Sequence, residues 1–537
     1  MRVSCLPTPI VARKFGSLAW PAPRGAALMA VCLVLGACSD GSDEDLPSAT
    51  QLRAICASIV GKQLGAVTVS AAKRYEADSA RGTPAFCQVQ ATQPPYLDFE
   101  VILPDNWSGR LWQQGGGGFD GFIDSAVVLD AAGKVQALSR AVGQQAAVYA
   151  TSNGGNRQSV AAEAGPMVWF DGTPAGAQSL QDYDYASVGK TVHFAKALTA
   201  EFYGRKPSKT YFSGCSNGGR NAYAAIQRWP EEYDGVVSGC MGMDLAGQTA
   251  MWMNIAKVEG TPAMPTATQW NRLYQAAVAA CDARDGLTDG IIANYAGCDF
   301  DVSTQACGQA GASSDPSICL SAAQVATAKT LVSSLTSSAG SVVYSRYQWA
   351  DWSTSFYGVL GGAYMAIATS DVSWITSPAR QATFDLGQHL GPLTIGLQQT
   401  GADNDKRAVA DFVAAGKKVI HWHDGADELV SLEDHQRNIA LVHEMAKAKG
   451  LADPAQASRF FIVPGTNHSG GQSLTAVDWS KAIIDWVEAG IAPSQLTYTA
   501  STAAQGVRTL PVCPYPQYPR YVSGDTSLST SYTCTAP

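Results

Sequence analysis

Ser216 lies in residues 214–218 (GCSNG), which fit the pattern G-x-S-x-G. In this pattern a serine stands on a sharp turn between a strand and a helix, and the helix N-terminus faces the negative charge that develops during acyl transfer. The pattern alone occurs by chance in many chains. Here residues 210–213 predict a strand before the turn and residues 221–228 a helix after it. We therefore expect Ser216 to be a nucleophile.

A serine hydroxyl needs a base to accept its proton. His468 lies in residues 464–471 (PGTNHSGG), a loop directly after the predicted strand 459–463, and is the expected base. His421 and His423 stand two residues apart on another predicted strand. They could be metal ligands, but packing within the sheet is the favoured interpretation.

The base in turn needs an acid to orient it and to stabilise its charged form. Asp427 follows the predicted strand 418–422 and is the expected acid, with Asp424 on the same loop as the competitor. The resulting order Ser216, Asp427, His468 is the order found in α/β-hydrolases.

An oxyanion hole requires two backbone N–H groups. Asn217, the residue after the nucleophile, should supply one. Four consecutive glycines at 115–118 follow the predicted strand 110–113 and allow close backbone approach, so Gly117 should supply the other. The alternative for the glycine run is a plain flexible loop.

A second cluster of polar residues lies at 281–291 (CDARDGLTDGI), where Asp282, Asp285 and Asp289 fall within eight residues. Carboxylates with turn-forming glycines suit a hard, oxygen-binding cation such as calcium. An acidic surface turn is an equal alternative from the residues alone.

Alternating predicted strands and helices surround these residues and indicate an α/β fold with a mostly parallel sheet. The alternation stops at about residue 244 and resumes after residue 404, so we expect an α/β-hydrolase core interrupted by a large inserted lid domain. The expected segments are a signal peptide at 1–37, a tether at 38–55, the core at 56–243 and 405–537, and the lid with the cation site at 244–404.

The N-terminus predicts export. Basic residues precede an apolar stretch at 26–37 that is too short to span a bilayer comfortably, and the stretch ends in Leu-Gly-Ala before Cys38. This resembles a bacterial lipobox, so Cys38 would carry a lipid anchor in the periplasm or outer membrane. Ordinary cleavage and free secretion is the alternative.

Ten cysteines remain after the signal and anchor, and an even number in an oxidising compartment suggests five disulfides. Sequence cannot prove connectivity, but proximity suggests the pairs Cys56–Cys87, Cys281–Cys298, Cys307–Cys319 and Cys513–Cys534, which leaves Cys215 with Cys240. Two free thiols at Cys215 and Cys240 are the alternative.

Taken together, residues 115–121, 214–220, 281–292, 420–427 and 464–468 resemble the tannase and feruloyl esterase family over nearly the whole mature chain. The resemblance implies an α/β-hydrolase core with a lid and hydrolysis of aromatic esters by Ser216, Asp427 and His468. It also implies a structural calcium ion held by the side chains of Asp282, Asp285 and Asp289 and the backbone oxygens of Leu287 and Ile291.

One position departs from the family, which usually has a cysteine after the catalytic histidine, bridged to the cysteine before the nucleophile. Ser469 stands there in this chain, so Cys215 lacks that partner and we expect it to pair with Cys240.

The expected function is therefore hydrolysis of small aromatic or phenolic esters through an acyl-enzyme. The alternatives are an aliphatic ester or oligoester hydrolase and a non-catalytic, lipid-anchored binding protein. A net charge of −8 argues against a nucleic-acid partner. Substrate contacts are expected in the lid, where an aromatic acid could stack and an arginine could bind a free carboxylate, although lid packing and surface exposure are the favoured interpretations of the residues concerned: Trp349, Trp352, Phe356, Tyr357, Trp374, Arg346 and Arg380.

Overall fold

The computed structural model describes residues 46–537 apart from 158–164, 311, 355, 473–475 and 503–505. The predicted signal peptide, the predicted anchor Cys38 and the first part of the predicted tether lie outside the described residues.

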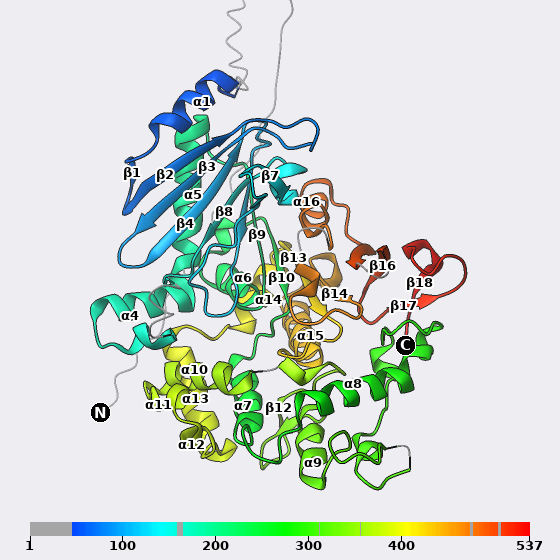
Figure 1. The fold of residues 1–537 in the computed structure, drawn as a ribbon. Helices are drawn as coiled ribbons and strands as arrows, with labels where there is room; N and C mark the ends of the chain where they lie inside the picture. Colours follow the sequence, from blue (N-terminus) through cyan, green and yellow to red (C-terminus); the bar gives the residue numbers. More distant parts are fainter. Residues whose placement is uncertain (1–45, 158–164, 311, 355, 473–475, 503–505) are drawn as a thin grey trace, which may run out of the picture. The chain divides into compact units, whose positions relative to one another are not determined.

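The core is a 12-stranded sheet with the order β1-β2-β3-β4-β8-β5-β9-β10-β13-β14-β16-β15 (Figure 1). Its strands, in chain order, are β1 (Gln63–Leu64), β2 (Val67–Tyr75), β3 (Phe86–Gln93), β4 (Leu97–Pro104), β5 (Arg110–Gln114), β8 (Val148–Ser152), β9 (Lys209–Cys215), β10 (Gly235–Gly239), β13 (Lys418–Asp424), β14 (Ser458–Val463), β15 (Leu496–Thr502) and β16 (Gly506–Pro514).

The sheet is mixed. Strands β8, β5, β9, β10, β13 and β14 pair in parallel, whereas β1 to β4 on one side and β16 and β15 on the other pair antiparallel. The prediction of a mostly parallel sheet is thus wrong for the edges. Antiparallel strands joined by short turns need no crossover helix, so they leave no strand–helix alternation in the sequence.

Helices cover both faces of the central strands, which explains why these strands are buried along nearly their whole length. Apolar side chains of α5 (Ser187–Tyr203), α6 (Asn217–Arg228), α14 (Lys406–Ala414) and α15 (Leu432–Ala448) share one cluster with Val236 and Val419. The next residues along the same strands, Val237 and Ile420, pack on the other face with α2 (Arg140–Gly143) and α16 (Trp479–Ala489).

The chain between β10 and β13 contributes no described strand to this sheet. It forms a two-stranded sheet of β11 (Leu335–Thr336) and β12 (Val342–Tyr344) and a group of helices (Figure 1). Its buried side chains form an aromatic-rich cluster that also takes in residues of the α/β core such as Trp169 and Leu429. The helices are α7 (Leu245–Ala256), α8 (Ala267–Cys281), α9 (Ala322–Leu331), α10 (Tyr357–Thr369), α11 (Ser373–Thr376), α12 (Pro378–Gln381) and α13 (Leu386–Thr400). This is the arrangement expected of a lid inserted into an α/β-hydrolase core.

The tether predicted for residues 38–55 is wrong at its C-terminal end, because helix α1 (Ala49–Ser58) begins there. Ser48 caps the helix by accepting a hydrogen bond from the Gln51 backbone while the Gln51 side chain accepts one from the Ser48 backbone. Leu52 and Cys56 are buried on its inner side, and Cys56 is bonded to Cys87.

The structure contains disulfides between the five predicted pairs: Cys56–Cys87, Cys215–Cys240, Cys281–Cys298, Cys307–Cys319 and Cys513–Cys534. Within the described part of the chain, none of the helices has the length and apolar character needed to cross a bilayer.

Candidate active site

Ser216 stands on the turn between β9 and α6 with φ 59° and ψ −126°. An L-residue rarely adopts this backbone conformation, and such strain persists only where the surroundings enforce it. Its backbone N–H donates to Gly239 O at 3.1 Å, at the end of the neighbouring strand. The turn therefore presents the Ser216 side chain at the C-terminal edge of the sheet.

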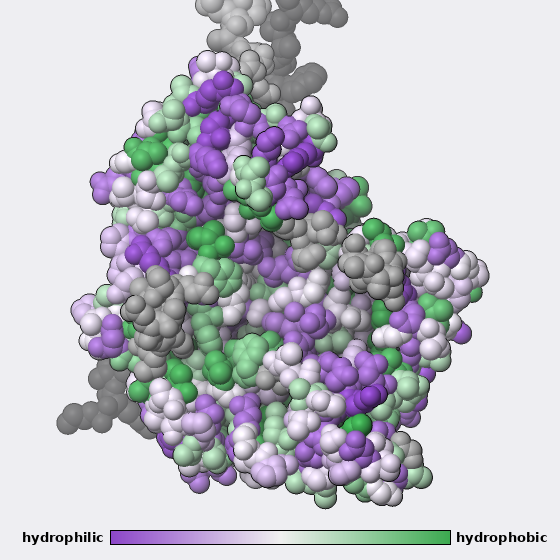
Figure 2. Space-filling model, viewed as in Figure 1, coloured by the Kyte–Doolittle hydropathy of each residue, from purple (hydrophilic) through white to green (hydrophobic). Residues whose placement is uncertain are grey.

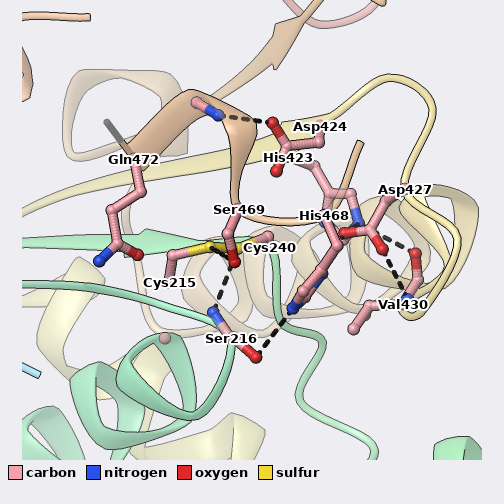
Figure 3. The surroundings of a disulfide bond; sticks show 12 residues. Cys215, Ser216, Cys240, His423, Asp424, Asp427, Val430, His468, Ser469 and Gln472 are labelled. Carbon is pink, nitrogen blue, oxygen red and sulfur yellow. Dashed lines mark hydrogen bonds and ion pairs between the residues drawn. A yellow bond between two sulfur atoms is a disulfide. The ribbon is translucent and has the colours of Figure 1, made fainter. Parts of the chain in front are cut away.

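His468 and Asp427 reach Ser216 from the loops after β14 and β13, which are parallel to β9 and follow it in the sheet in the order β9-β10-β13-β14. His468 Nε2 lies 2.9 Å from Ser216 Oγ, and His468 Nδ1 lies 2.8 Å from Asp427 Oδ2 (Figure 3). The other carboxylate oxygen of Asp427 accepts the backbone N–H groups of Leu429 and Val430, both at 2.8 Å. This geometry allows His468 to take a proton from Ser216 while Asp427 holds its ring.

The charges of this pair support each other. Burial by itself would lower the pKa of His468, but the Asp427 charge and hydrogen bond outweigh burial and raise it to about 9. Burial would raise the pKa of Asp427, but the charge of His468 and hydrogen bonds from His423 and His468 hold it well below its usual range. Asp427 is therefore an anion throughout the neutral range.

The glycine run packs directly on the nucleophile turn. Gly115 N donates to Ser213 O at 2.8 Å, and a Cβ on Gly218 would lie 2.6 Å from Gly116 O. Only glycine permits this approach. Gly117 and Asn217, the two predicted oxyanion donors, both line the cavity in front of Ser216.

The Asn217 side chain is held on both sides. Its amide Nδ2 donates to Asp120 Oδ1 at 2.7 Å, and its carbonyl oxygen accepts from the buried Arg220 Nε at 2.8 Å. Asp120 thereby ties the glycine loop to the first turn of α6.

A cavity of about 600 Å³ opens onto Ser216 and His468. Both the core and the insertion contribute walls, and apolar side chains gather around a hollow on this face of the molecule (Figure 2). The aromatic residues of its lining are Trp112, Phe119, Phe122, Tyr149, Trp252, Phe356, Tyr364, Trp422 and Trp479.

Comparisons with known proteins agree with this site. The family model of tannase and feruloyl esterase matches residues 81–386 and 390–535. Mono(2-hydroxyethyl) terephthalate hydrolase of Piscinibacter sakaiensis is 30% identical over 534 residues, which cover 86% of each chain. A probable feruloyl esterase of Arthroderma benhamiae is 27% identical and covers 80% of this chain and 81% of its own. Among solved structures, feruloyl esterase B from Aspergillus oryzae superposes with a TM-score of 0.74 at 22% identity, over 90% of this chain and 100% of that one.

The chain belongs to the tannase and feruloyl esterase family. It is a carboxylic ester hydrolase with an α/β-hydrolase core.

The departure from the family at Ser469 is visible beside the nucleophile. Cys215, at the end of β9, is bonded to Cys240, just after the neighbouring strand β10 (Figure 3). Ser469 Oγ lies 3.4 Å from Cys215 Sγ, and Ser216 N donates to Cys240 Sγ at 3.1 Å. In this esterase the bridge joins two adjacent strands instead of joining the nucleophile turn to the histidine loop.

Asp424, the competing acid, points away from His468. Its Oδ1 accepts the Thr466 hydroxyl at 2.6 Å and Gly471 N at 2.9 Å, while its Oδ2 has no hydrogen-bond partner among the described residues. Burial, and then the neighbouring Asp427 charge, raise the pKa of Asp424 to about 7. Asp424 lies within 4.8 Å of the Cys215 and Cys240 sulfurs, but a disulfide offers no thiolate for a metal.

The other predicted residues are placed as follows. Of the lid aromatics, Phe356 lines the cavity, whereas Trp349, Trp352, Tyr357 and Trp374 are buried in the core of the insertion. Arg346 pairs with Glu433, and Arg380 pairs with Asp371 and stacks on Trp374; neither arginine lines the cavity.

The three aspartates of the predicted calcium site lie on the segment after α8. Asp282 accepts hydrogen bonds from the backbones of Asp289 and Gly290, and Asp285 accepts from Leu287 and Ala293. Asp289 accepts a hydrogen bond from Ile291 N and forms an ion pair with Arg508.

Three contacts were not predicted from the sequence: those made by Asp120, Glu428 and His423. Glu428 accepts the backbone N–H of His468 at 3.0 Å, and His423 Nε2 lies 3.3 Å from Asp427 Oδ2. Asp120 and Glu428 adjoin residues that the sequence did single out, so adjacency was the available signal.

We expect Asp427→Asn to lower kcat by about 10⁴-fold, because an amide cannot hold His468 in the reactive tautomer. Asp424→Asn should retain most activity.

Because only neutral His468 accepts a proton, kcat/KM should rise with pH through the raised His468 pKa of about 9. Asp424 contributes to that rise in pKa, so Asp424→Asn should move the midpoint of the pH profile to lower pH. A greater loss of kcat in Asp424→Asn than in Asp427→Asn would reverse the assignment.

Proposed function

We propose that this esterase hydrolyses esters of aromatic, hydroxylated acids through an acyl-enzyme. Ser216 attacks the carbonyl carbon while His468 accepts its proton, and Asp427 stabilises the resulting imidazolium. The backbone N–H groups of Gly117 and Asn217 bind the oxyanion. The observation that carries the proposal is the hydrogen-bonded series from Asp427 to Ser216 at the mouth of an aromatic-lined cavity.

The wall of the cavity favours a flat ring. Trp252 and Tyr364 stack at 6.1 Å between centroids, and both line the cavity together with Phe119. The relatives named above act on terephthalate and ferulate esters, both of them aromatic, which supports the same substrate class here.

Gln248 favours a ring that carries hydrogen-bonding substituents. Its side chain on α7 is fully buried and lines the cavity, and neither its Nε2 nor its Oε1 has a partner among the described residues. A buried amide without partners is costly, and a substrate hydroxyl would satisfy it. The charged side chains of the lining include two acids, Asp124 and Asp478, and one arginine, Arg140, so the lining has no excess of positive charge that would select a free carboxylate.

A panel of esters tests this function. Methyl ferulate and methyl gallate should be hydrolysed with higher kcat/KM than a terephthalate monoester or a short aliphatic ester. Ser216→Ala should lose at least about 10³-fold in kcat, since the nucleophile, base and acid act as a unit. Ser208→Ala, which removes the hydroxyl that donates to Gly109 O before β9, is the matched control and should retain activity.

Each other outcome has a meaning. Turnover of the aliphatic ester alone would replace the aromatic specificity with an aliphatic or oligoester hydrolase. Absence of any Ser216-dependent turnover from folded protein would favour a binding protein of the same fold.

We also propose a structural calcium ion at residues 282–291, held by the carboxylates of Asp282, Asp285 and Asp289 and the backbone oxygens of Leu287 and Ile291. Burial, and then the charges of Asp289 and Asp282, raise the pKa of Asp285 to about 7, and a cation bound there would favour the charged form of this carboxylate. Hard oxygen donors of this kind fit calcium. The three carboxylates do not all lie within 4.8 Å of one another, so binding would draw them together.

Calcium should raise the Tm of the wild-type protein, and a chelator should reverse the shift, because an ion that binds only the folded state stabilises it. Asp285→Asn should abolish this response, since it removes a ligand. Asp299→Asn, a surface carboxylate paired with Arg284 nearby, is the control and should keep it. A wild-type Tm that is independent of calcium would remove the ion from the proposal.

We further propose that the protein is exported and anchored through a lipid on Cys38. The five disulfides suit an oxidising compartment. Residues 39–45 have the small and acidic composition of the predicted tether.

Wild-type protein expressed in a Gram-negative host should fractionate with membranes. Cys38→Ser should move it to the soluble fraction, because the acceptor of the lipid is lost. Soluble wild-type protein with a free N-terminus near residue 38 would instead establish secretion.

A further inference from the structure

A second series of hydrogen bonds begins at His423, whose Nε2 approaches Asp427 Oδ2, the oxygen that His468 also contacts. His423 Nε2 lies 3.3 Å from Asp427 Oδ2 and 3.1 Å from Val430 O. His423 Nδ1 lies 3.0 Å from His435 Nδ1, and His435 Nε2 lies 2.7 Å from the Tyr223 hydroxyl. His423 and Val430 adjoin Asp427 in Figure 3.

The series continues towards the surface. The Tyr223 hydroxyl lies 3.0 Å from His421 Nδ1, and His421 Nε2 lies 3.0 Å from Ser458 Oγ. Ser458 Oγ lies 2.9 Å from Nε2 of His443, which is partly exposed on α15. Tyr223, His421, His423 and His435 are all fully buried.

The acceptors at the inner end, together with a neutral His423, determine the direction of every bond. Val430 O and Asp427 Oδ2 can only accept, so His423 Nε2 carries a proton. If His423 is neutral, its Nδ1 accepts and His435 Nδ1 must donate. His435 Nε2 then accepts from Tyr223.

The outer half follows in the same way. The Tyr223 oxygen accepts from His421 Nδ1–H, His421 Nε2 accepts from the Ser458 hydroxyl, and Ser458 Oγ accepts from His443 Nε2–H. All protons therefore point towards Asp427. The opposite direction requires a second proton on His423, which would place a buried positive charge beside Asp427.

We propose that this series, with all of its rings neutral, is a positioning network that fixes the tautomer of His423, so that the N–H group beside Asp427 carries no positive charge. The inference rests on the proposed roles of Asp427 and His468. Its consequence is that the charge of Asp427 stays available to the imidazolium of His468, because no competing cation stands beside it.

Burial supports the neutral state of the inner rings. It lowers the pKa of both His421 and His435 well below the ordinary histidine value, and the neighbouring histidines lower it further. Each of these rings then has one N–H and one acceptor nitrogen, as the series requires.

The first test is NMR of the full protein labelled with ¹⁵N-histidine, because ¹⁵N shifts distinguish the two neutral tautomers from the charged ring. Apart from His468, which titrates, two buried rings should carry slowly exchanging Nδ1–H protons, those of His421 and His435. Slowly exchanging Nε2–H protons on these two rings, or a charged His423 at neutral pH, would overturn the inference.

The second test is Tyr223→Phe, which leaves His435 Nε2 without its donor. We expect about a 5- to 20-fold fall in kcat, the kinetic equivalent of one lost buried hydrogen bond, with KM nearly unchanged. The Nδ1–H signal of His435 should change as well. Tyr233→Phe is the matched control, because it removes the hydroxyl of another buried tyrosine, bonded to Gln113 Oε1 at 2.7 Å outside the series.

The outcomes separate this inference from the proposed function. If Ser216→Ala abolishes turnover but Tyr223→Phe behaves like Tyr233→Phe, the inference fails and the function stands. If Ser216→Ala keeps its turnover, the function fails whatever the tautomers are.

Discussion

The contact between two backbone segments, the glycine run at 115–118 and the turn at Ser216, is the constraint on which this active site depends. A Cβ on Gly214 would lie 2.4 Å from Gly218 O, and one on Gly219 would lie 2.3 Å from Gly239 O. The turn is thus enclosed by backbone on several sides, which allows the strained conformation of Ser216 to persist. Side chains then secure the position, through Asn217 to Asp120 and through the disulfide that joins the ends of β9 and β10.

Two carboxyl groups three residues apart show how surroundings assign different states to the same chemical group. Asp427 is surrounded by donors, two backbone N–H groups on one oxygen and two histidines on the other, so its pKa falls. Asp424 is equally buried but has a bare oxygen, and its pKa rises to about 7. The charge of His468 and then hydrogen bonding to the charged form outweigh burial at the first position, and burial prevails at the second.

The sequence predicts the site better than it predicts the edges of the fold or the cavity. Ser216, His468 and Asp427 follow central parallel strands, whose apolar runs and following turns are local signals. The polar start of α6 concealed that helix's true beginning at Asn217, because Arg220 is buried there and donates to backbone oxygens of a distant segment. The antiparallel strands β2 and β3 were also not predicted, because the strands they pair with, rather than their own residues, define them. Likewise, neither Arg346 nor Arg380 reaches the cavity, because each pairs with an acid that only the folded chain brings near.

The pair His421 and His423 shows how a local pattern can have two structural meanings. Side chains two residues apart on a strand point to the same face, as two metal ligands would. That face of β13 carries α6 and α15, which place Tyr223 and His435 against the two rings. Each nitrogen of both rings already has a hydrogen-bond partner in the protein, so no lone pair is left to bind a metal. The sequence analysis favoured packing within the sheet for His421 and His423, and in the structure this packing consists of polar hydrogen-bonded contacts. The innermost ring of the series, that of His423, lies beside Asp427, whose carboxylate contacts His468.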